Sequence, residues 1–157
     1  MLFCHTTDKG VGSMKQEDTI RLLQECNAGI KMGVASIDEV INRVENENFR
    51  TLLFTEKQTH ESLGTETSKI LYDYGDNGKQ PNPVAKTMSW MKTNVKTAVE
   101  PGDSTIADLI TDGCNMGVKS LRRYLNQYQE AEQSVKDIAN RLIQSERNLT
   151  EGVAQYL

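Results

Sequence analysis

The sequence predicts an all-α protein, a four-helix bundle built from two related helical hairpins. Apolar residues recur at spacings of three and four along four separate segments, the pattern of helices that bury one face. In addition, the stretch Cys26-Asn-Ala-Gly-Ile-Lys31 returns 88 positions later as Cys114-Asn-Met-Gly-Val-Lys119. A helical unit that occurs twice in the chain accounts for both observations.

The composition is that of one domain of ordinary size. Of the 157 residues, 37% are hydrophobic and 25% are charged, which is typical neither of a disordered segment nor of a membrane protein. No apolar run approaches the about 20 residues of a membrane span. The net charge of −4 argues against a nucleic-acid partner. Three cysteines make no disulfide framework and no secretory signal is visible, so we expect a cytoplasmic protein.

The N-terminal end shows no helical periodicity. We therefore expect residues 1–14 to form a flexible tail and residues 15–157 to form the bundle domain. Cys4 and His5 lie in this tail, and we expect neither of them to be functional.

The first predicted hairpin covers residues 15–75. Its first helix is expected over residues 15–46 and its second over residues 49–74. Asn48 is a suitable N-cap for the second helix, and Gly75 is a suitable stop.

Polar residues interrupt the buried faces of this hairpin. On the first helix Asn27 lies in the apolar stripe, and Gly29 and Gly33 are expected to allow close approach of another helix. The predicted buried face of the second helix includes two ionisable residues; its members are Phe49, Leu53, Glu56, His60, Leu63, Thr67, Ile70 and Tyr74.

A long crossover is predicted over residues 76–103. Glycine and proline dominate its first part, and a short amphipathic helix that carries Trp90 is expected over residues 84–98. Because this segment separates the two repeat units, we expect it to run along the bundle rather than to close a hairpin.

The second predicted hairpin covers residues 104–157. Its first helix is expected to begin near Asp103 and to continue to about residue 129. Its second helix is expected to open at Ser134, with Asp137 as a capping-box partner. Glu146 lies on the inward face of this last helix.

The two matching stretches and the Trp90 helix, which is followed by Gly102-Asp103, resemble the ferritin-like superfamily. The closer resemblance is to a group of small bacterial ferritin-like proteins, a domain of unknown function with a duplicated hairpin. It covers residues 17–157. The resemblance implies a ferritin-like four-helix bundle with a long crossover, and it implies that a metal site belongs in the bundle core.

The ligand set of that metal site is incomplete in this chain. Active di-metal members of the superfamily place a glutamate on each first helix and Glu-x-x-His on each second helix. At the first-helix positions this chain has Ile30 and Val118, which have no metal-binding atom. The second helices offer Glu56, His60 and Glu146 only. The missing ligands argue against a di-metal oxidase or ferroxidase.

Two interpretations of the remaining ionisable residues stay open. Glu56, His60 and Glu146 could hold a single transition metal such as iron(II), zinc or manganese. Alternatively, they form a buried polar layer with Asn27 and Asn115, because buried charges must find partners. We favour the polar layer and therefore expect no cofactor.

The paired cysteines also allow two interpretations. Cys26 and Cys114 could act as a thiol pair in redox chemistry or metal binding, or they could pack as small apolar side chains. We favour packing, because no pattern of basic residues beside them indicates a lowered thiol pKa.

Three functional hypotheses follow. The leading one is a non-enzymatic ferritin-like bundle with a degenerate di-metal site that acts through self-association, as a homo-oligomer, or through a protein partner. The second is a single-metal binding or stress-related protein that uses Glu56, His60 and Glu146. The third is a thiol-based stress protein that uses Cys26 and Cys114.

Overall fold

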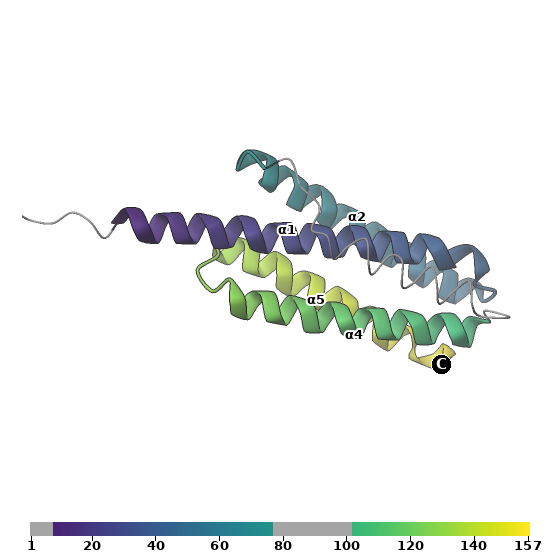
Figure 1. Cartoon of the computed structure of the whole chain (residues 1–157). Helices are drawn as coiled ribbons and strands as arrows, with labels where there is room; N and C mark the ends of the chain where they lie inside the picture. The colour runs from purple at the N-terminus through teal and green to yellow at the C-terminus, as the bar shows by residue number, and fades with distance from the viewer. Residues whose placement is uncertain (1–7, 77–101) are drawn as a thin grey trace, which may run out of the picture.

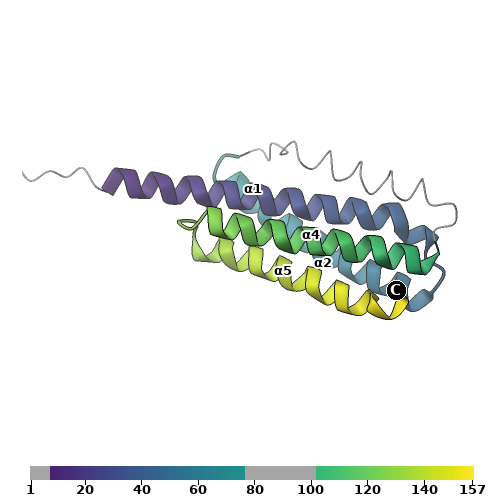
Figure 2. The same cartoon turned by 60° about the horizontal axis from the view of Figure 1, so that its bottom comes forward.

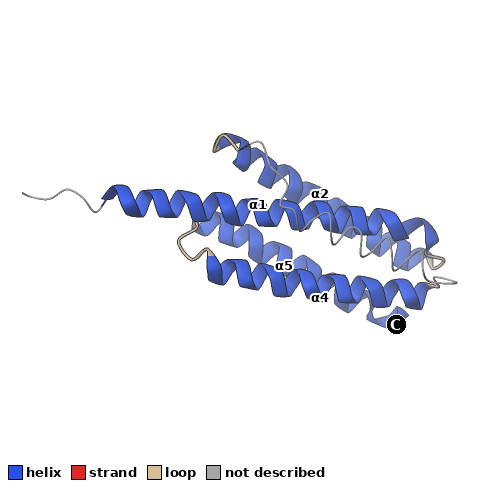
Figure 3. Cartoon of the chain, viewed as in Figure 1, coloured by secondary structure: helices blue, strands red, loops and turns tan. Residues whose placement is uncertain are grey.

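Four long helices make up the described part of the molecule. The computed structural model describes residues 8–76 and 102–157, and within these ranges it contains helices and turns but no strand (Figures 1 and 3). The elements in chain order are α1 (Asp8–Val40), a 3₁₀ turn (Ile41–Arg43), α2 (Glu47–Asp73), α4 (Asp103–Gln127), α5 (Gln133–Val153) and a second 3₁₀ turn (Ala154–Tyr156). The predicted all-α fold with four bundle helices is therefore confirmed.

The start of α4 lies against the turn between α1 and α2. The carboxylate of Asp103 accepts hydrogen bonds from the backbone N–H groups of Glu45 (2.8 Å) and Asn46 (2.9 Å). Helix α2 ends at the opposite end of the bundle, so that α2 and α4 run in the same direction (Figure 2). The end of α2 and the start of α4 therefore lie at opposite ends of the bundle. The short helix predicted over residues 84–98 and Trp90 lie outside the described residues.

The turn between α4 and α5 is attached to α1. The backbone N–H of Glu130 donates to the Asp18 carboxylate (3.0 Å), and the N–H of Glu132 donates to the Thr19 hydroxyl (2.9 Å). Together with Asp103 at the other end, these contacts fix the position of one hairpin along the other.

Two predicted helix starts were wrong. Helix α1 begins at Asp8, so residues 8–14, which we predicted to be part of a tail, are helical. Adding turns to an existing helix costs much less than nucleating one, which is why a weakly patterned segment can extend it. Helix α2 is capped by Asn46 rather than Asn48, and the Asn46 side chain accepts a hydrogen bond from the Phe49 N–H (3.0 Å).

The remaining helix ends agree in part with the sequence. Gly75 has a φ of +73° and ends α2 as predicted, since glycine tolerates this left-handed conformation. The predicted capping box of Ser134 and Asp137 is absent: the N-cap of α5 is Glu132 without a side-chain cap, and Asp137 accepts from Gln133 instead.

Two apolar clusters form the core. The Leu22 cluster lies toward the α4–α5 turn and includes Leu22, Leu23, Leu63, Leu71 and Leu142. The Phe49 cluster lies toward the α1–α2 turn and includes Phe49, Leu53, Ile106, Leu149 and Val153.

The ring of Phe49 stacks on Tyr156, with centroids 4.5 Å apart. Along α2, Glu56 and His60 lie between Leu53 of the Phe49 cluster and Leu63 of the Leu22 cluster. A polar layer therefore separates the two clusters. In the described ranges, every helix falls short of the length and apolarity that a membrane span requires.

Candidate functional site

His60 is the centre of the polar layer. Its side chain is 1% exposed, and it lies between two glutamates. Its Nε2 is 3.0 Å from Oε1 of Glu146 on α5, and its Nδ1 is 3.0 Å from the backbone carbonyl oxygen of Glu56 one turn earlier on α2. The structure thus brings together the three ionisable residues that the sequence placed on inward helix faces.

These contacts locate the protons of His60. A carbonyl oxygen only accepts, so Nδ1 carries a proton and donates it to Glu56. The 3.0 Å contact between Nε2 and Glu146 needs a second proton, which resides either on the imidazole or on the carboxyl group. Burial alone lowers the pKa of His60, but the hydrogen bond and the charge of Glu146, with smaller effects from Glu56, raise it above its ordinary value.

Two further side chains, those of Ser145 and Cys114, hydrogen-bond to the glutamates of the layer, and neither role was predicted from the sequence. The hydroxyl of Ser145 donates to the carboxylate of Glu56. The thiol of Cys114 hydrogen-bonds to Glu146. Burial raises the pKa of Glu56, and the hydrogen bond from Ser145 offsets part of that effect. Ser145 directly precedes the inward Glu146, and this position was the only signal for it in the sequence.

Neither asparagine belongs to this layer, contrary to the prediction. Asn27 is buried, but its amide donates to the hydroxyls of Thr67 (2.9 Å) and Ser68 (3.0 Å). Asn115 is exposed on α4. Although Asn27 and Asn115 match in the repeat, the side chains around α1 and α4 differ, so only one of the two faces the interior.

The side chains of Glu56, His60 and Glu146 do not converge on one point in this structure. The carboxylate of Glu56 lies on the Nδ1 side of the ring, at 3.5 Å, whereas Glu146 lies on the Nε2 side. The three groups form a row with the imidazole in the middle rather than converging on one point. In the part of the chain that the structure describes, no group of three or more histidine, cysteine, aspartate or glutamate side chains could hold a metal ion.

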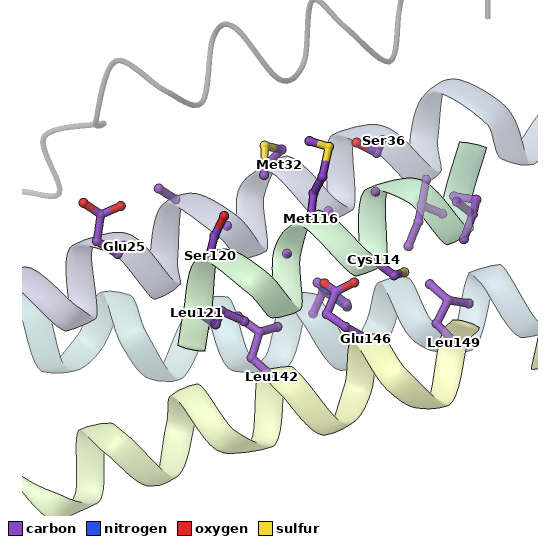
Figure 4. A pocket seen from close by; sticks show the side chains of 18 of the residues that line it. Glu25, Met32, Ser36, Cys114, Met116, Ser120, Leu121, Leu142, Glu146 and Leu149 are labelled. Atoms are coloured by element: carbon purple, nitrogen blue, oxygen red, sulfur yellow. The ribbon is translucent and has the colours of Figure 1, made fainter. Parts of the chain in front are cut away.

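A cavity of about 160 Å³ lies beside the polar layer, between α1 and α4. Figure 4 shows Met32 of α1 and Met116 of α4 along its upper side and Leu142 and Glu146 of α5 below it. Both facing helices line it with small residues, namely Ala28, Gly29, Gly33, Ser36, Gly113, Gly117 and Ser120.

The glycines have two different roles at this cavity. A Cβ atom added at Gly33 would lie 2.8 Å from Cδ2 of His60, so Gly33 is required for the histidine ring to lie there. A Cβ atom at Gly29 would meet nothing within 4 Å. The prediction that both glycines allow close packing is therefore correct for Gly33 and wrong for Gly29, which borders open space. The repeated Gly-x-x-x-Gly spacing on α1 and α4 was the sequence signal for the cavity.

Among the described residues, the ionisable ones that line the cavity are Glu25, His60, Cys114, Tyr124 and Glu146, and none of the described lining residues is a lysine or an arginine. Glu25 lies at one end and hydrogen-bonds to Tyr124. Burial raises the pKa of Glu25, and the Tyr124 hydrogen bond partly offsets this.

Both repeated cysteines are buried and free. Burial raises the pKa of Cys26 to about 12, with a smaller effect from the charge of Glu25. Burial and the adjacent Glu146 raise the pKa of Cys114 as well. A thiol with a raised pKa carries almost no thiolate at neutral pH, so neither cysteine has the electrostatic surroundings of a nucleophile.

Comparisons with known proteins give no relative from which a role could be transferred. The chain matches no protein-family model, no curated protein and no solved structure.

Proposed function

We propose that this protein binds a small, largely apolar molecule in the cavity between α1 and α4. The observation that carries the proposal is the cavity itself: two facing helices present small residues to a space that no side chain of the described residues fills, beside buried polar groups. Ligand sites in helical bundles combine these two features, an apolar wall and a few fixed polar groups.

The size of the cavity limits the ligand. An engineered protein cavity of about 150 Å³ binds benzene. The cavity of about 160 Å³ in this chain therefore suits a molecule with about one six-membered ring. Met32 and Met116 on its upper side have flexible thioether side chains that adapt to the shape of a ligand.

We further propose that binding, rather than catalysis, is the activity of this site. The raised pKa values of Cys26 and Cys114 disfavour nucleophilic thiolates. Both ring nitrogens of His60 already have partners within the protein, which leaves the imidazole no free nitrogen to act as an acid or a base. The row-like arrangement of Glu56, His60 and Glu146 supports a structural layer more than the single-metal alternative.

Titration calorimetry with benzyl alcohol, a neutral one-ring probe, tests this proposal. We expect saturable binding of one molecule per chain in the unchanged protein. Gly29→Leu should abolish it, because Gly29 borders the cavity and its new side chain would fill the space. Gly12→Leu is the matched control, since Gly12 is exposed on the same helix and a Cβ atom added there would have no described atom within 4 Å. Absent binding, or binding that survives Gly29→Leu, would contradict the proposal.

Two expectations from the sequence, a ferritin-like relationship and self-association or a protein partner, remain predictions. A ferritin-like relationship is supported by the two hairpins and the repeated cysteine stretches; an experimental structure in which α1–α2 superposes on α4–α5, with Cys26 over Cys114, would test it. Self-association or a protein partner is tested by the mass of the protein in sedimentation velocity, where a monomer alone would exclude a homo-oligomer.

A further inference from the structure

We infer that the ligand of this cavity is a small organic ammonium, an apolar body with one protonated amine that donates to the carboxylate of Glu146. The inference rests on the proposed function and adds the chemical class of the ligand to it. It is carried by the charge of the cavity walls and by the position of Glu146.

The walls of the cavity carry net negative charge. Among the described residues, those that line the cavity include two carboxylates, Glu25 and Glu146, and one histidine, with no lysine or arginine. With Glu25 ionised, the described lining has a net charge of −1 whether the proton between His60 and Glu146 resides on the imidazole or on the carboxyl group. An anion would be repelled in either state, whereas a cation is complementary to the walls.

Glu146 is placed to receive an ammonium group. Its carboxylate points from α5 toward α4 and the cavity (Figure 4), and its side chain is 12% exposed. A Cβ atom at Gly117 would lie 3.5 Å from its Cδ, so the glycine leaves the carboxyl group uncovered on the α4 side. His60, at 3.0 Å from Oε1, and the Cys114 thiol use two of the about four hydrogen bonds that a carboxylate accepts, so acceptor positions remain for an ammonium group.

The apolar remainder of the cavity makes the charge contact selective. An ammonium that entered a purely apolar space would lose its hydration without compensation, which is costly. Against Glu146 it gains a charge-assisted hydrogen bond in surroundings that screen charge weakly. A neutral analogue of the same shape keeps the apolar contacts but lacks this bond.

Three probes of matched shape test the inference: benzylammonium, benzyl alcohol and benzoate, each titrated calorimetrically into the full chain at pH 7. We expect benzylammonium to bind at least about tenfold more tightly than benzyl alcohol, and benzoate not to bind. Equal affinity for benzylammonium and benzyl alcohol would overturn the inference and leave the proposed function intact. Failure of all three probes to bind would contradict the proposed function itself.

Variants assign the charge contact to one residue. Glu146→Gln keeps the shape and an acceptor for His60 but removes the negative charge, so we expect the ratio of the benzylammonium affinity to the benzyl alcohol affinity to fall to about one. Glu151→Gln, exposed on the same helix, is the control and should change neither affinity. Loss of the preference in Glu25→Gln but not in Glu146→Gln would overturn the assignment to Glu146. The ranking of the three probes in the unchanged protein decides the charge preference even if Glu146→Gln does not fold.

Discussion

The two hairpins place matching sequence stretches in different surroundings. Cys26 of α1 is fully buried in the apolar Leu22 cluster, whereas its counterpart Cys114 on α4 lies against the Glu146 carboxyl group and the cavity. Gly29 borders open space, and its counterpart Gly117 lies above Glu146. The repeated cysteine stretch therefore does not define a site by itself, because the residues of the facing helices decide what surrounds each copy.

The second helices explain this difference. Helix α2 supplies the buried His60 and Glu56, and α5 supplies Glu146, which contacts His60, and Ser145, which donates to Glu56. Polar groups from both hairpins meet in one layer instead of forming two equivalent halves. The bundle thus has a single candidate site on a framework whose sequence is repeated.

The largest expected effect comes from removing the histidine that joins the two hairpins. His60→Leu should lower the free energy of unfolding by about 3 kcal/mol, because Glu56 and Glu146 lose the partner between them. The double variant His60→Leu with Glu146→Leu should cost less than the sum of the two single variants. Urea denaturation of the four proteins measures this, and strict additivity would show that the pair is not coupled.

Alanine at Gly29 and alanine at Gly33, both on α1, should change the stability in opposite directions. Gly33→Ala should destabilise the protein by about 1–2 kcal/mol, since its Cβ would overlap the His60 ring, which hydrogen bonds hold in place. Gly29→Ala should stabilise it by about 0.5–1 kcal/mol through helix propensity alone. Thermal unfolding of both variants checks the signs; equal shifts would mean that His60 does not contact α1.

Replacing each of the two repeated cysteines by serine should lower the stability by different amounts, because their surroundings differ. Cys26→Ser places a hydroxyl in the Leu22 cluster and should cost about 2 kcal/mol. Cys114→Ser can donate to Glu146 as the thiol does, and should cost under about 1 kcal/mol. Equal losses in chemical denaturation would contradict the asymmetry between the two repeats.

The pH dependence of stability should report the buried imidazole. Because the pKa of His60 is raised in the folded state, its stabilising contribution is full below the ordinary value of 6.5 and is lost as the pH rises through the folded-state pKa. The loss is about 1.4 kcal/mol for each unit of the shift. The free energy of unfolding should therefore fall more between pH 6 and pH 9 in the unchanged protein than in His60→Gln. If the free energy of unfolding changed with pH in the same way in both proteins, the pKa of His60 would not be raised in the folded state.

Much of the fold could be predicted from helical periodicity. The spacing of three and four on α2 identified the buried residues from Phe49 to Thr67, including the polar Glu56 and His60, because side chains on one face of a helix share one environment. At the end of α2 the pattern selected Ile70, whereas Leu71 is the residue that is fully buried.

Contacts between helices were harder to predict. Asn46 and Asn48 are both suitable N-caps for α2, and which of them caps the helix depends on where the preceding turn ends. Gly29 and Gly33 have the same helix propensity, so the residue facing each glycine decides its role. Gly33 faces His60 and allows close packing, whereas Gly29 faces no described side chain within 4 Å and borders the cavity. Asn115 matches Asn27 in sequence and is nevertheless exposed. Such differences arise from tertiary neighbours, which the local pattern does not contain.

The most direct test of the central claim is the ¹⁵N NMR signal of the His60 ring during titration with benzylammonium. The chain has only two histidines, so His60→Gln identifies the signal. We predict that the ligand shifts the Nε2 resonance of His60 in a saturable way in the unchanged protein and in Gly12→Leu, but not in Gly29→Leu. An Nε2 resonance that stays unchanged while benzylammonium binds would show that the ligand lies elsewhere and would contradict the assignment of the site.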